Sequence, residues 1–168
     1  MATTEIDASL FIKMTLDAWE VYNKRVDDLL EKLSDEQLLK ETATGRNTGI
    51  YLLGHLVAVT DGIAPLIGAG EKSYPELTDI FLVSPDKSGK VMPSIEELKQ
   101  YWKKANERLR MFFTTMKPAD WFSRHTAVTE ESFIKEPFRN KLNIIINRTN
   151  HQSYHLGQLI YLLPGSRE

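Results

Sequence analysis

Cysteine is absent from this chain of 168 residues, and histidine occurs only four times. Without cysteine there is no disulfide framework, no thiolate zinc site and no cysteine nucleophile, and a reducing compartment is compatible with the composition. Long apolar runs are also missing, since none approaches the ~18 residues that a membrane span needs. The N-terminus, Met1 to Asp7, lacks the charged-then-apolar layout of a signal peptide. We therefore expect no membrane partner and a cytoplasmic location.

An excess of charge of either sign is missing as well. The chain has 21 Lys and Arg residues against 23 Asp and Glu residues, and its formal net charge is -2. Because basic and acidic residues are scattered among one another, we expect no nucleic-acid partner. With 42% hydrophobic and 26% charged residues, the composition is typical of a globular domain that can bury a core. We expect residues 1–168 to form a single domain.

Four segments carry apolar residues at steps of three and four, which predicts amphipathic helices. They run from Ile6 to Leu33, from Asn47 or Thr48 to about Ile67, from Ser94 to Pro118, and from Phe138 to Leu163. The long segment 68–93 between the second and third is punctuated by glycine and proline, which is typical of a crossover connection. The sequence predicts an all-α fold, a four-helix bundle with a long crossover between helices 2 and 3. A pair of helical hairpins that needs a partner is the alternative.

Three local signals refine this prediction. Ser34–Gln37 and Ser94–Glu97 both have the spacing of a capping box, which marks a helix start. Gly54, next to His55, predicts the close approach of a neighbouring helix. Within the crossover, only Ile80–Val83 has the pattern of a short strand or a helical turn.

His151 and His155 lie four residues apart in the last predicted helix. This spacing places both imidazoles on one face, with Cβ atoms roughly 5–6 Å apart, so both can reach a single metal ion. Asn147 and Gln158 fall one turn to either side on nearly the same face. Exposed surface histidines or hydrogen-bonded core histidines are the alternative for such a pair.

His55 stands alone in the apolar second helix, without another histidine, acid or base between Asn47 and Thr60. A buried imidazole is costly unless it is neutral and hydrogen-bonded or bound to a metal. A core histidine bonded to a backbone carbonyl therefore competes with a metal ligand as the interpretation.

Two familiar metal signatures are excluded. The run from His151 to His155 has the spacing of a zinc-protease motif, but Gln152 stands where the catalytic glutamate is needed. Neither histidine has the Glu-x-x-His partner of a di-iron bundle, because position 148 is Arg and position 152 is Gln. Three neutral imidazoles would suit zinc or nickel better than magnesium or calcium, and three protein ligands leave a position open for substrate.

Two longer motifs contain these histidines, namely Asn47-Thr-Gly-Ile-Tyr-Leu-Leu-Gly-His55 and Asn150-His-Gln-Ser-Tyr-His-Leu-Gly-Gln158. With them the sequence resembles the DinB-like (damage-inducible) metalloenzyme family, and the resemblance covers nearly the whole chain. It departs from the family at Leu156, where arginine is frequent. The resemblance implies a four-helix bundle with a divalent metal held by three histidines, which here are His55, His151 and His155. Relatives with this fold include thiol-dependent S-transferases and a thiol-dependent isomerase.

The remaining polar residues receive more general expectations. Asn147, Tyr154 and Gln158 are candidates for contact with the metal ligands or the substrate, or for ordinary interhelix hydrogen bonds. We expect His125 to be a solvent-exposed or hydrogen-bonded loop residue and Asp61 to point away from the site. The segments 68–93 and 119–137 are expected to wall the substrate cavity.

We expect a metal-dependent enzyme that acts on a small-molecule substrate. S-transfer from a low-molecular-weight thiol is favoured over hydrolysis, because the ligand helices offer no carboxylate base. A loop acid, Asp79, Glu130 or Glu131, would reverse that preference. A non-catalytic metal- or ligand-binding stress-response protein is the alternative from another class. Together with the family resemblance, the apolar residues of the first and third helices indicate a homodimer.

Overall fold

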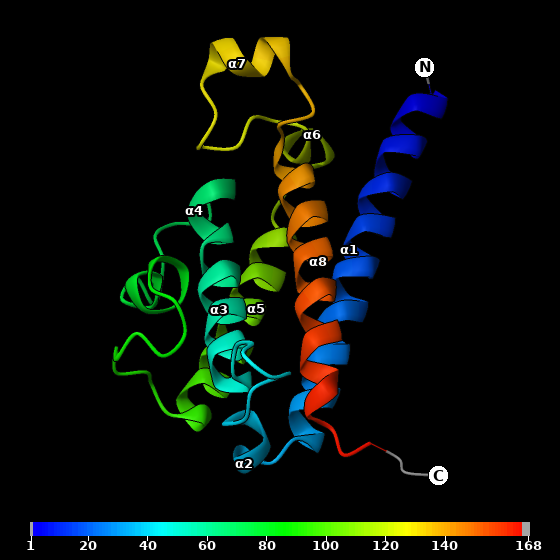
Figure 1. Cartoon of the computed structure of the whole chain (residues 1–168). Coiled ribbons are helices and arrows are strands. Elements are labelled where there is room, and N and C mark those ends of the chain that lie inside the picture. The colour runs from blue at the N-terminus through cyan, green and yellow to red at the C-terminus, as the bar shows by residue number, and fades with distance from the viewer. Residues whose placement is uncertain (1, 166–168) are drawn as a thin grey trace.

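The structure, a computed structural model, describes residues 2–165 and is all-α over that range, as predicted (Figure 1). Its helical elements in chain order are α1 (Ala2–Lys32), α2 (Asp35–Leu38), α3 (Gly49–Asp61), α4 (Ile63–Ile67), the π-helical turn η1 (Asp79–Val83), α5 (Ile95–Phe113), α6 (Pro118–Trp121), α7 (Glu130–Lys135), α8 (Lys141–Leu159) and the 3-10 turn η2 (Ile160–Leu162). The described residues contain two isolated β-bridges but no strand.

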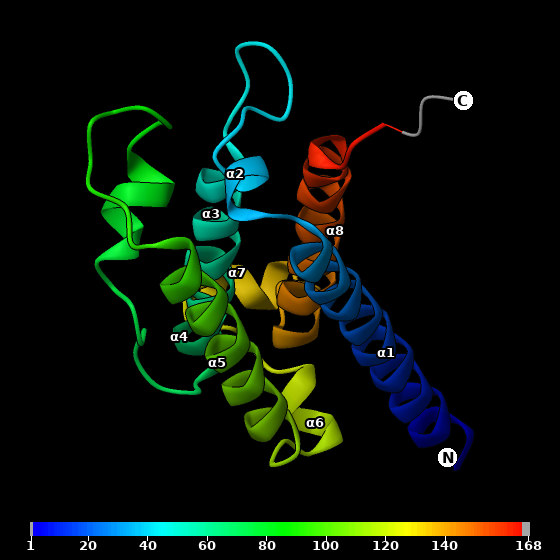
Figure 2. The ribbon, with the colours of Figure 1, turned by 90° about the horizontal axis from the view of Figure 1, so that it is seen from below.

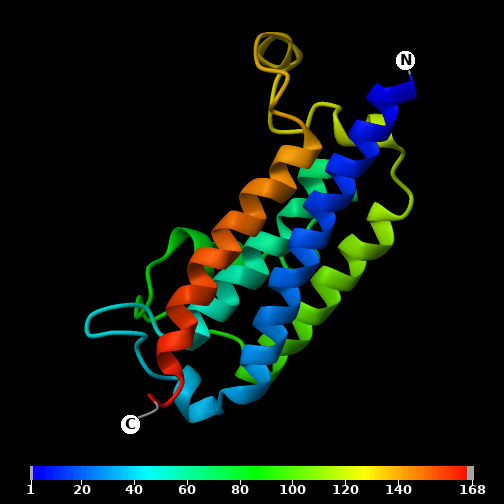
Figure 3. The same ribbon diagram turned by 90° about the vertical axis from the view of Figure 1, so that its right-hand side faces the viewer.

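The long helices α1, α3, α5 and α8 lie side by side and enclose the core (Figures 1 and 3). Helix α1 packs along α8, α8 along α3, and α3 along α5, and the view from below shows the same neighbours (Figure 2). Helix α5 is joined back to α1 by the Arg110–Glu20 ion pair at 2.7 Å and by a 2.7 Å hydrogen bond from the Trp102 indole to Asp27. These contacts are compatible with the predicted four-helix bundle.

The second long helical segment, Gly49–Ile67, comprises α3 and α4. The Thr48 side chain caps its start by accepting a hydrogen bond from the Tyr51 amide. By length and composition alone this segment could cross a membrane, which corrects our expectation that no apolar run approaches that length. However, 67% of its apolar window is buried inside the protein, as in the core helix of a soluble domain.

The crossover between α4 and α5 turns back onto α3. Gly68, at φ 87°, ends α4 in the left-handed conformation that glycine favours. The buried Asp61 carboxylate accepts hydrogen bonds from the backbone amides of Ser73 and Tyr74, both at 2.9 Å. Asp61 therefore anchors the crossover. It is not part of the histidine cluster, in agreement with the sequence prediction.

The helix termini follow the predicted capping signals. Both capping boxes are present, at Ser34 before α2 and at Ser94 before α5. The last long helix begins at Lys141, later than the predicted Phe138, because the Asn140 side chain caps it by accepting from the Asn143 amide at 2.9 Å. Its final turn narrows to the 3-10 turn η2.

Candidate metal centre

The three histidines of the sequence prediction converge between two helices. His151 and His155 extend from α8, and His55 reaches them from α3. The Nε2 atom of His151 lies 3.1 Å from Nε2 of His55 and 3.0 Å from Nε2 of His155. The side chains are half-buried, and their potential ligand atoms all lie within 4.8 Å of one another.

The outer ring nitrogens of two of these histidines are held by oxygen acceptors. Nδ1 of His55 donates to the backbone carbonyl of Phe81 at 2.9 Å. Nδ1 of His155 donates to the amide oxygen of Gln158 at 2.7 Å. Because these bonds fix the proton on Nδ1, Nε2 of each ring carries a lone pair directed at His151. Such hydrogen bonds to the outer nitrogen are typical of imidazoles that ligate metals.

The geometry and the donor set fit a divalent cation. Tetrahedral zinc with Zn–N bonds of ~2.0–2.1 Å separates its nitrogen ligands by about 3.3 Å, close to the two Nε2 separations observed. A single proton on His151 can serve only one strong hydrogen bond at a time, whereas a cation at the centre would satisfy all three lone pairs. Among the described residues no carboxylate belongs to the cluster. The cluster is therefore compatible with a metal site built from imidazoles alone.

Burial favours the neutral form of His151 and His155. Desolvation, aided by the neighbouring His155, His55 and Arg148, lowers the pKa of His151 from 6.5 to about 4. Desolvation also lowers the pKa of His155, although its hydrogen bond with Gln158 opposes this shift. A neutral imidazole retains the lone pair that a metal requires, so these two side chains are available as ligands at neutral pH.

The sequence profile of the DinB superfamily matches residues 18–159, a range that includes all three histidines. The chain belongs to the DinB superfamily. The family resemblance read from the two histidine motifs is thus confirmed. None of the curated proteins compared with the chain matches it significantly.

In this DinB-superfamily chain, Gly54 brings the crossover against α3 beside His55. A Cβ atom on Gly54 would lie 2.2 Å from Cζ of the buried Phe81 ring, so only glycine leaves room for the turn η1. Seated there, Phe81 presents its carbonyl to Nδ1 of His55. The predicted close approach at Gly54 is real, but the neighbour is the π-helical turn of the crossover. The bond from His55 to a backbone carbonyl, predicted as the alternative to a metal ligand, is thus present beside the histidine cluster. Sequence reasoning did not identify Phe81 as its source, because a backbone carbonyl has no side-chain signature.

A polar cavity of about 260 Å³ opens beside His155. It is lined by Thr42, Gly45, Arg46, Asn47, Tyr154, His155 and Gln158. Neither of the two segments predicted to wall the substrate cavity, 68–93 and 119–137, lines this one. In the second of them, α6 and α7 lie at the opposite end of the long helices (Figure 1). The connector between α2 and α3 takes that place, a role that was not predicted.

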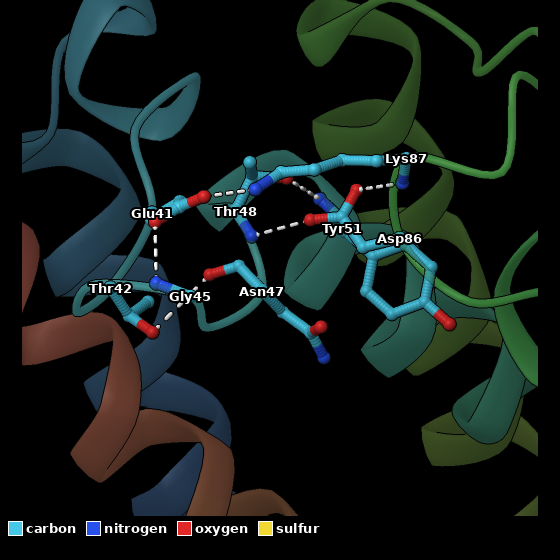
Figure 4. A network of polar contacts seen from close by, with 8 residues as sticks. All are labelled: Glu41, Thr42, Gly45, Asn47, Thr48, Tyr51, Asp86 and Lys87. Atoms are coloured by element: carbon cyan, nitrogen blue, oxygen red, sulfur yellow. Dashed lines mark hydrogen bonds and ion pairs between the residues drawn. The ribbon is translucent and has the colours of Figure 1, made fainter.

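This connector is tied to the crossover by a polar network (Figure 4). The Thr48 amide donates to Asp86 at 2.7 Å, and Lys87 pairs with Glu41. The other carboxylate oxygen of Glu41 accepts from the Gly45 amide at 2.8 Å. The cavity wall is therefore positioned by the same crossover that orients His55.

The three polar candidates flanking the histidines have different surroundings. Gln158 binds His155, as expected of a residue that orients a ligand. Tyr154 is exposed, with its ring centroid 5.1 Å from that of His155. Asn147 is exposed, and its side chain makes no hydrogen bond to another described residue. Only Gln158 thus contacts a candidate ligand through a hydrogen bond.

The environment of His125 differs from the prediction. It was expected to be exposed or hydrogen-bonded, yet it is buried, and its Nδ1 has no hydrogen-bond partner among the described residues. Desolvation, with smaller contributions from Arg139 and Arg124, lowers its pKa. The Thr126 amide, next in the chain, bonds to the carbonyl of Leu66 at 3.0 Å, and this tie draws the loop inward onto α4.

Gln152, which excluded the zinc-protease motif, is buried on the face of α8 that packs against α1. Its amide donates to the side-chain oxygen of the fully buried Asn23 on α1 at 3.0 Å. This hydrogen bond joins α8 to α1 and helps to set the rotation of α8 about its axis, which directs His151 toward α3. Sequence reasoning missed Asn23. A polar residue in the apolar stripe of α1 is the signal that could have found it.

Proposed function

We propose that the chain is a metal-dependent enzyme whose divalent ion, zinc or nickel, is bound by Nε2 of His55, His151 and His155. The observation that carries this proposal is the convergence of three Nε2 atoms. In two of these imidazole rings, an oxygen acceptor holds the Nδ1 atom. Imidazole ligands suit borderline ions, and a three-ligand set is typical of catalytic sites that keep a position open.

When bound, the ion would act as a Lewis acid and would lower the pKa of a bound thiol or water toward neutral pH. The chain itself would hold His151 and His155 neutral and orient His55 and His155 through Phe81 and Gln158. It would admit a small molecule by the cavity beside His155. The polar lining of that cavity supports a polar small-molecule substrate.

Among reactions open to such a site, we propose S-transfer from a low-molecular-weight thiol to an electrophile. The thiol sulfur forms a bond to carbon, the leaving group departs with its bonding electrons, and the thiol proton passes to water. The positions of three acids support this choice over hydrolysis, which more often requires a carboxylate base. Asp79 pairs with Lys90 and Glu131 pairs with Lys135, while Glu130 is exposed on α7.

The test is a thiol-conjugation assay with zinc- or nickel-loaded protein. Several cellular thiols are supplied separately, and conjugation of a chromogenic electrophile is followed in wild type and in His151→Ala. We expect thiol-dependent turnover that His151→Ala abolishes. Thiol-independent hydrolysis of an ester or amide, lost in the same variant, would identify a hydrolase instead. Metal binding without either turnover would favour a metal- or ligand-binding stress-response protein.

We also propose a homodimer and a cytoplasmic location. The dimer is supported by apolar side chains that α1 leaves exposed, namely Leu10, Phe11, Met14 and Val21. The third long helix contributes less than expected, because α5 buries its tryptophan and exposes only Met111 among its large apolar residues. Light scattering over a wide concentration range tests the dimer, and a constant monomer mass would contradict it.

A further inference from the structure

Arg148 is a half-buried arginine without an acidic partner. The other half-buried arginines each lie near a carboxylate: Arg108 is 3.9 Å from Asp61, Arg110 is 2.7 Å from Glu20, and Arg139 is 3.1 Å from Glu136. The guanidinium of Arg148 has no ion pair and no hydrogen bond with any residue whose side chain the structure describes, residues 8–165. Its surroundings therefore differ from those of every comparable arginine in the described chain.

The position of Arg148 places its charge beside the histidine cluster. It lies on α8 one turn before His151 and seven residues before His155, so all three side chains share one face of the helix. Arg148 is close enough to His151 to lower the pKa of that imidazole. Desolvation lowers the pKa of the Arg148 guanidinium itself, while no neighbouring acid compensates its charge.

A positive charge that is partly removed from water costs free energy unless an anion neutralises it. In the described residues, the protein supplies no such anion at Arg148. The guanidinium presents five donors in a planar fork, which matches the oxygens of a carboxylate or phosphate. Next to a site that would handle a small molecule, the missing partner is most simply part of that molecule.

We propose that Arg148 binds an oxyanion group, carboxylate or phosphate, of the small molecule that reacts at the three-histidine centre. This inference rests on the proposed function and adds the substrate class, namely a molecule that carries an anionic group one helical turn from its reacting atom. The hydrogen-bonding fork of Arg148 would fix the orientation of the molecule, while its reacting atom lies at the imidazole cluster.

The test compares anion binding by wild type, Arg148→Gln and Arg148→Lys, using isothermal titration calorimetry in low-salt buffer. The probes are succinate, for a carboxylate, and inorganic phosphate, and each is titrated into zinc-loaded and chelator-treated full-length protein. We expect Arg148→Gln to weaken the preferred probe at least tenfold, since hydrogen bonds between charged groups are lost. Arg148→Lys should recover part of the affinity, because it keeps the charge but not the fork.

Arg25→Gln is the matched control, because it removes one arginine charge from α1, where the guanidinium lies over the Tyr22 ring. It should bind both probes as wild type does. Equal affinities of wild type and Arg148→Gln, or no binding of either probe by wild type, would overturn the inference. Zinc content measured on the same samples reports on the proposed function separately. If zinc does not bind, the chelator-treated proteins still decide whether Arg148 binds an oxyanion.

Discussion

Removing the central imidazole should abolish the stabilisation that a metal confers on this chain. His151 is the ring whose Nε2 lies close to both others, at 3.1 Å from His55 and 3.0 Å from His155. The His151→Ala variant leaves only two imidazoles, which belong to different helices. Because a bound ion would join α3 to α8, its loss should lower the melting temperature of the fold.

The size of this stabilisation by bound metal follows from mass action. A ligand that binds only the folded state stabilises it by ~2.7 kcal/mol when its free concentration is ~100 times its dissociation constant. For a domain of 150–250 residues, each kcal/mol shifts the melting temperature by ~2–4 °C. We therefore expect a chelator to lower the melting temperature of zinc-loaded wild type by roughly 5–10 °C.

The assay is differential scanning fluorimetry with and without chelator. His151→Ala should show no chelator effect, whereas His125→Ala should keep the full effect. His125 is a suitable control because it is buried and lies outside the histidine cluster. Any change that it causes in the baseline melting temperature is the same with and without chelator. Equal responses of wild type and His151→Ala to chelator would refute the metal assignment.

Three further predictions concern single residues. Gly54→Ala should destabilise the fold by about 1–3 kcal/mol in denaturant titrations, because its Cβ would lie 2.2 Å from a buried aromatic ring. Gly157→Ala is its control on α8, because a Cβ at this position meets nothing within 4 Å. This substitution should stabilise the fold by about 0.5–1 kcal/mol. A loss of stability at both positions would contradict the steric argument. Gln158→Leu removes the acceptor for Nδ1 of His155 and should weaken zinc binding about 10–100-fold in a competition titration with a chromophoric chelator; unchanged affinity would count against that orienting role. The lowered pKa of His125 means that its stabilising effect is complete above the unfolded pKa of about 6.5 and is lost as the pH falls. His125→Leu should therefore flatten the loss of stability between about pH 7 and 5 in urea titrations, and an unchanged slope would exclude this linkage.

Local chemistry explains why much of the fold was predictable from sequence. The capping boxes at Ser34 and Ser94 depend on atoms within four residues, so the helix starts follow from the sequence alone. The spacing of His151 and His155 likewise guarantees a shared helix face. Their association with His55 depended on the family resemblance, because no local rule predicts which face of α3 meets α8.

Tertiary packing decided the rest. The acceptor for His55 is the carbonyl of Phe81, 26 residues away, and it arrives there only because Gly54 admits the turn η1. The burial of His125, predicted to be exposed or hydrogen-bonded, arises from a loop that bonds back to Leu66. The lack of a partner for Arg148 is likewise invisible in the sequence. Charge compensation depends on distances between residues that only the folded chain brings together, whereas helix periodicity and capping are properties of neighbouring residues.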